Sequence, residues 1–85
     1  MEKLTLNDGT ELLDSYAVET LDNLFLYIRS GLNMMQVFML VYDPNKISMI
    51  RYTAGDTVTE FGGYTMVQGI TQEHGGMISV VLRRA

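Results

Sequence analysis

The sequence predicts an α+β fold: a small antiparallel β-sheet built from successive hairpins, with one α-helix packed on it. Two observations predict it. Short segments that alternate apolar and polar residues follow one another, separated by turn pairs such as Asp8-Gly9 and Gly55-Asp56. One longer apolar run, residues 33–44, instead places its apolar side chains at helical spacing. At 85 residues, without an internal repeat or linker, the chain is expected to form a single domain, 1–85.

The apolar run is expected to be a helix over about residues 33–42. Asn33 is a suitable N-cap, and Gln36 three residues later completes a capping box. Pro44 ends the helix, because the residue before a proline is pushed out of the α region. The side chains expected to contact the sheet recur along one helical face and are Met34, Val37, Phe38 and Val41.

Strands are expected on both sides of the helix, at residues 4–6, 10–13, 24–28, 47–52, 57–61, 64–72 and 77–83. Residues 15–21 fit either an edge strand or an extended loop. The segment 24–28 is apolar on both faces, which indicates a central strand covered on both sides. Together with 47–52 and 77–82 it is expected to be among the best-buried strands. Gly62-Gly63 is expected to form a flexible or bulged joint.

The composition argues against catalysis and against a bound metal or cofactor. The chain has no cysteine, which excludes disulfides and thiolate metal sites. His74 is the only histidine and lies in a predicted turn, so no second imidazole can share a metal with it. The aspartates fall almost entirely at turns, where they make local hydrogen bonds. We therefore expect no enzyme, no catalytic residues, no metal and no cofactor.

Charge and hydropathy limit the possible partners and locations. A net charge of −4 argues against nucleic-acid binding, which needs a basic face, and Arg83 with Arg84 is expected to be a solvated terminus. No apolar run is long enough to span a bilayer, and the amino terminus lacks a basic segment followed by an apolar one. We expect a soluble, cytoplasmic protein that binds neither nucleic acid nor membrane.

The expected helix is apolar on its second face as well, at Met35, Met39 and Tyr42. A helix packed on one sheet needs a single apolar stripe, so these three side chains are the predicted interaction surface. The seven methionines of the chain suit a surface that adapts to its partner. In the competing interpretation, the first strand or residues 15–21 cover this face.

A second functional hypothesis is a small-molecule or peptide-binding domain with a cleft between helix and sheet. Its contacts would be tyrosines, whose rings are apolar and whose hydroxyls are polar, namely Tyr27, Tyr42, Tyr52 and Tyr64. The same tyrosines also fit ordinary packing, in which the ring turns inward and the hydroxyl reaches water. A concentration-dependent oligomer would favour the interaction surface over the cleft.

Several short motifs occur in a recognisable order: Asp43-Pro44 after the helix, then Phe61-Gly62-Gly63-Tyr64-Thr65, then the strand 78–83, with Asp8-Gly9-Thr10 near the start. In this order they resemble a group of short, uncharacterised proteins carried by phages and prophages of Gram-positive bacteria. The resemblance implies a tail-region accessory or virion-related protein without known enzymatic activity, and no catalytic residues. Together with the second apolar face of the helix, it leads us to expect the protein itself or another phage-type structural protein as the partner, with virion association as an alternative to a cytoplasmic location.

Overall fold

The computed structural model describes residues 1–84 and confirms the α+β class with antiparallel strands. Two short helices lie in the middle of the chain, α1 (Met34–Val41) and α2 (Pro44–Ile47), where a single helix was expected. The strands are β1 (Glu2–Thr5), β2 (Glu11–Leu13), β3 (Tyr16–Glu19), β4 (Asn23–Ile28), β5 (Met49–Ala54), β6 (Thr57–Gly62), β7 (Tyr64–Gln72) and β8 (Ile78–Arg84), with a 3-10 turn at His74–Gly76.

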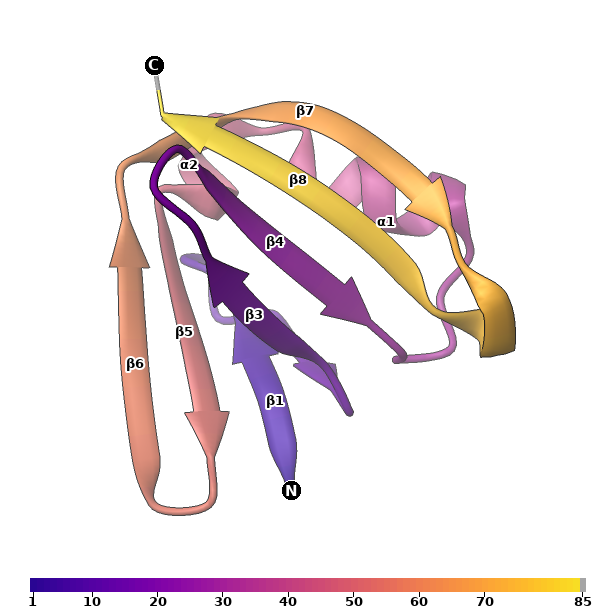
Figure 1. The fold of residues 1–85 in the computed structure, drawn as a ribbon, viewed down its shortest axis with the longest axis horizontal. Coiled ribbons are helices and arrows are strands. Elements are labelled where there is room, and N and C mark those ends of the chain that lie inside the picture. The colour runs from indigo at the N-terminus through magenta and orange to yellow at the C-terminus, as the bar shows by residue number, and fades with distance from the viewer. Residues whose placement is uncertain (85) are drawn as a thin grey trace.

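Over the described residues the strands form two four-stranded sheets rather than the one sheet expected. Their orders are β2-β1-β5-β6 and β3-β4-β8-β7. Each sheet therefore consists of two hairpins, and the chain alternates between the sheets hairpin by hairpin (Figure 1). The helices lie where the chain passes from β4 in the second sheet to β5 in the first. The sequence predicts each hairpin locally, but nothing local assigns a hairpin to one sheet or the other.

The expected turns form as predicted. In the β1–β2 hairpin the carboxylate of Asp8 accepts the backbone N–H of Thr10 at 3.0 Å, which lowers the pKa of Asp8. Gly55 opens the two-residue turn between β5 and β6 with a φ of 60°, a conformation that costs glycine little. The segment that fitted a strand or a loop is the edge strand β3, paired with β4.

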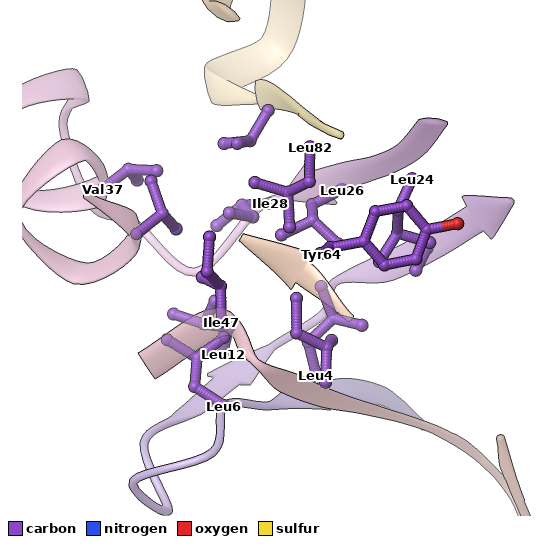
Figure 2. Packing of buried hydrophobic residues seen from close by; sticks show 14 of the residues in the cluster. Leu4, Leu6, Leu12, Leu24, Leu26, Ile28, Val37, Ile47, Tyr64 and Leu82 are labelled. Carbon is purple, nitrogen blue, oxygen red and sulfur yellow. The ribbon is translucent and has the colours of Figure 1, made fainter. Parts of the chain in front are cut away.

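Both sheets and α1 share one hydrophobic core. Leu4, Leu6 and Leu12 enter it from the β1–β2 hairpin, opposite Leu24, Leu26, Ile28 and Leu82 of the second sheet (Figure 2). Val37 of α1 and Ile47 of α2 close one side of it. One shared core is what a chain of this size can fill, because two separate cores would leave each with too little buried surface.

The buried strands agree with expectation for β4 and β8 and differ for β5. In β4 the side chains of Leu24, Leu26 and Ile28 are buried, and the opposite face is half-covered rather than closed. Ile50 is the one fully buried residue of β5, whose other residues are half-exposed. The expected strand 47–52 also begins too early, because Ile47 ends α2. Pro44 starts that helix and Asp43 caps it through the N–H of Asn45 at 2.9 Å.

The joint expected at Gly62-Gly63 is the crossing from the first sheet to the second. Gly63 has a φ of 87° and donates its N–H to the carbonyl of Ser48 at 3.1 Å. Tyr64 follows at once and is fully buried, while its hydroxyl donates to Glu19 Oε2 at 2.6 Å. Arg84 lies over the Tyr64 ring at 4.3 Å from its centroid, so this arginine is not the freely solvated terminal residue expected.

Replacing Leu26 with alanine is expected to lower the free energy of unfolding by about 2–5 kcal/mol, because the side chain is fully buried between the sheets. Leu21→Ala removes the same atoms from a side chain that is 91% exposed, so it should change the free energy of unfolding by less than about 0.5 kcal/mol. Urea denaturation of both variants measures the difference. Equal effects would mean that Leu26 is not in the core.

Tyr64 is expected to make stability fall at alkaline pH. Burial of the phenol, and next its hydrogen bond to Glu19, raise the pKa of Tyr64 above 10.0. The folded state therefore keeps a proton that the unfolded state loses, so this contribution is complete below about pH 10 and is lost as pH rises through the folded pKa.

Tyr64→Phe removes the hydrogen bond to Glu19 and should lower the free energy of unfolding at pH 7 by about 1.5 kcal/mol. This is the low end of the range for a hydrogen bond to a charged acceptor, chosen because Glu19 is partly exposed. The variant should also lose less stability than the wild type between pH 9 and 12, as followed by chemical denaturation. If the stability of the two proteins fell in parallel over this pH range, the raised pKa of Tyr64 would not be the cause of the alkaline loss.

Candidate functional site

Helix α1 begins with the capping box that the sequence predicts. The N–H of Gln36 donates to Asn33 Oδ1 at 2.8 Å, and the N–H of Asn33 donates to Gln36 Oε1 at 2.9 Å. The N–H of Tyr42 ends the helix by donating to the carbonyl of Phe38 at 3.0 Å. Gln36 is the one polar side chain of the helix, and its amide is used by the cap. Helix α1 therefore carries no charged residue.

The helix enters the core through fewer residues than expected. Val37 and Val41 are fully buried, with Leu40 packed beside them. Met34 and Phe38, which were expected to contact the sheet, are 38% and 45% exposed. These two side chains stay partly exposed because α1 lies at the edge of the second sheet, where it packs against β7 and against α2. Only a narrow stripe of the helix therefore reaches the core.

The predicted interaction surface is exposed. Met35, Met39 and Tyr42 are 68%, 52% and 53% exposed. The ring of Tyr42 stacks on that of Phe38 with 5.8 Å between the centroids. The competing cover by residues 15–21 does not form, because β3 lies at the edge of its sheet opposite to β7, the strand that α1 contacts. We call the side chains of Met34, Met35, Phe38, Met39 and Tyr42 the helix face.

A groove continues the helix face toward the sheet. It has a volume of about 450 Å³ and is mainly apolar. Its walls come from the first half of α1 and the middle of β7, and consist of Met34, Met35, Phe38, Val67, Gln68, Gly69 and Ile70. The pairing of β7 with β8 shifts register between Val67 and Gly69, so the strand is bulged where it lines the groove.

The sequence did not reveal the β7 side of this groove. The available signal was the broken alternation of β7, where Met66 and Val67 are adjacent and Ile70 follows three residues later. A bulge changes which face a residue occupies, so strict period-2 counting misplaces this segment.

The tyrosines proposed for a cleft do not gather at one. Tyr64 is buried in the core, and Tyr52 donates its hydroxyl to Glu2, which raises the pKa of Tyr52. Tyr27 stacks on Tyr16 with 4.9 Å between the ring centroids. Tyr42 alone of the four belongs to the helix face. On its helix side, the groove between α1 and β7 is thus lined by methionine and phenylalanine instead of tyrosine.

Away from this groove, a second and mainly polar hollow of about 390 Å³ is lined by Glu2, Asp14, Tyr16, Arg29 and Gly75. His74 is exposed in the 3-10 turn. Among residues 1–84, no three histidine, cysteine, aspartate or glutamate side chains lie close enough together to hold a metal ion. No helix in this part of the chain has the length and apolar character needed to cross a membrane.

Comparison of the chain with protein-family models, with curated proteins and with solved structures found no match. The class of protein is therefore defined by its fold and surface: a small α+β domain of two antiparallel sheets with an uncharged, exposed helix face.

The double substitution of Met35 and Met39 by glutamate is expected to leave the fold intact. Both side chains are more than half exposed, so the free energy of unfolding should change by less than about 1 kcal/mol. Circular dichroism and urea denaturation measure this. An unfolded double variant would place these methionines in the monomer's own core and contradict the exposed helix face.

Proposed function

We propose that this protein is a non-enzymatic interaction module that docks an apolar partner surface on the helix face. The partner we favour is a second copy of the chain, with another phage-type structural protein as the biological alternative. The phage context rests on the sequence resemblance described above, and it would make the protein a structural or accessory component of a virion or prophage.

The observation that carries the proposal is the composition of the helix face. Methionine and aromatic residues are enriched in the centres of protein interfaces, and charged residues are depleted there. The helix face has this composition: three methionines, a phenylalanine and a tyrosine, without a charge on the helix. The ion pairs of the described residues, Lys3–Glu11, Arg51–Glu60 and Arg84–Glu19, all lie on the sheets.

The energetics favour a weak, concentration-dependent dimer. Full burial of a methionine side chain stabilises by about 1.5–3 kcal/mol, and half-exposed side chains gain about half of that. A two-fold interface uses the same residues from both copies, so the gain is doubled. Over the five side chains of the helix face in both copies the gain is about 8–15 kcal/mol, which falls within the range of about 4–15 kcal/mol that association costs.

A second candidate function is the binding of a small apolar molecule or an apolar peptide side chain in the groove beside β7. The groove volume of about 450 Å³ is within the usual range of ligand pockets, about 300–1,000 Å³. This hypothesis predicts a monomer that binds an apolar dye in the groove, and in which Phe38→Ala weakens dye binding.

Sedimentation equilibrium tests the dimer. The wild type is expected to increase in mass with concentration, and the Met35→Glu and Met39→Glu double variant to associate at least about tenfold more weakly, because each carboxylate would be buried without a partner. Added salt should not weaken the association, since helix α1 carries no charge.

Met66→Glu is the matched control, because Met66 is 50% exposed and lies outside both the helix face and the groove lining. It should associate like the wild type. A wild type that stays monomeric up to about millimolar concentration, or a double variant that associates as tightly as the wild type, would contradict self-association through the helix face.

A further inference from the structure

The four sheet edges within residues 1–84 differ in how far they are protected from pairing with another chain. Natural proteins protect edges with short strands, bulges or covering groups. Strand β2 has three residues, and β7 carries two register shifts. Strand β3 has four residues, and its Glu19 is bound by Tyr64 and Arg84. Each of these three edges is short, irregular or covered.

Strand β6 is neither short nor bulged, and only its last residue, Gly62, is covered, by Arg84. It pairs with β5 over six residues without a register shift, from Thr57 opposite Ala54 to Gly62 opposite Met49. Its other side is the end of the first sheet, and Figure 1 shows β6 on the outer side of the β5–β6 hairpin. Residues 57–60 are exposed on both faces of the strand. The sequence Thr-Val-Thr-Glu-Phe is rich in residues that favour strands.

The geometry of the hairpin shows which backbone groups are free. In an antiparallel pair closed by a two-residue turn, alternate residues of a strand direct their N–H and C=O groups toward the partner strand. Because Thr57 flanks the turn, Thr57, Thr59 and Phe61 face β5, and Val58 and Glu60 direct their backbone groups outward. The row of outward-directed backbone groups ends at Gly62, whose carbonyl accepts a hydrogen bond from Arg84 Nη2 at 3.3 Å.

We propose that β6 pairs antiparallel with β6 of a second copy, so that the two first sheets join into one continuous eight-stranded sheet. The pairing places Thr59 opposite the partner's Thr59, and Val58 opposite the partner's Glu60. Only outward-facing residues then exchange hydrogen bonds, as an antiparallel ladder requires. This contact is independent of the helix face and does not rest on the proposed docking there.

Side-chain chemistry selects this register among the possible two-fold pairings. A shift in one direction places Glu60 opposite the partner's Glu60, and a shift in the other places it opposite the partner's Asp56. Both are like-charge pairs, which destabilise a sheet. In the proposed register Glu60 faces a valine across the interface and keeps its ion pair with Arg51 at 2.7 Å on the other side. Thr59 against the partner's Thr59 is a favourable cross-strand pair.

Amide hydrogen exchange by NMR tests the pairing in the Met35→Glu and Met39→Glu background, which removes the proposed helix contact. The N–H groups of Val58 and Glu60 should exchange more slowly as concentration rises, by about tenfold when about nine-tenths of the chains are paired. Thr59 is the internal control, because its N–H already faces β5 and should not respond. No change at Val58 and Glu60 up to about millimolar concentration would overturn the proposal.

Substitutions at Val58, made in the same Met35→Glu and Met39→Glu background, test the register. Val58→Glu places a carboxylate opposite the partner's Glu60 and should weaken dimerisation at least about tenfold, whereas Val58→Lys at the same site should not. Val58→Pro removes an outward N–H that the β5 pairing does not use, so a folded monomer is expected. Equal affinities for the Glu and Lys variants, or a dimer retained with proline, would overturn the proposed register.

Discussion

The hydrogen bond from the Tyr64 hydroxyl to Glu19 is the contact on which much of the arrangement depends. Glu19 ends β3 and Tyr64 begins β7, the two edges of the second sheet, so this bond joins the sheet's opposite edges at one end. Arg84 adds an ion pair to Glu19 and a cation–π contact to the ring. The ring itself fills the shared core directly after the chain crosses from the first sheet at Gly63. One side chain thus connects the crossing between the sheets, both edges of the second sheet and the shared core.

A core already filled by two sheets explains the exposed helix face. Leucines and isoleucines from both sheets occupy most of the interior, and α1 adds only Val37 and Val41. Since the helix packs on the edge strand β7, its remaining apolar side chains have no layer of the same chain above them. Removing exposed apolar surface from water is favourable, so a face of this kind favours association.

The two proposed contacts differ in physical origin. The helix face would associate through the apolar side chains of an uncharged helix, whereas β6 would associate through backbone hydrogen bonds whose register charged side chains select. They lie on different elements, α1 beside β7 in the second sheet and β6 at the end of the first. A chain with two separate self-complementary contacts can join more than two copies, which suits a structural component of an assembly.

The sequence by itself determined the α+β class, the turns and the ends of the main helix, because these depend on residues near one another in the chain. Asn33 and Gln36 form the predicted capping box, and the glycine turns and β4 lie where periodicity placed them. The second apolar face of the helix, with Met35, Met39 and Tyr42, also followed from counting the faces of one helix, but its exposure was decided by the position of β3 at the far edge of the second sheet. Only the tertiary structure decided the division into two sheets, the exposure of Met34 and Phe38, and the groove against β7. Those features depend on which hairpins pair at long range and on bulges that reverse side-chain faces, and local spacing carries no information about either.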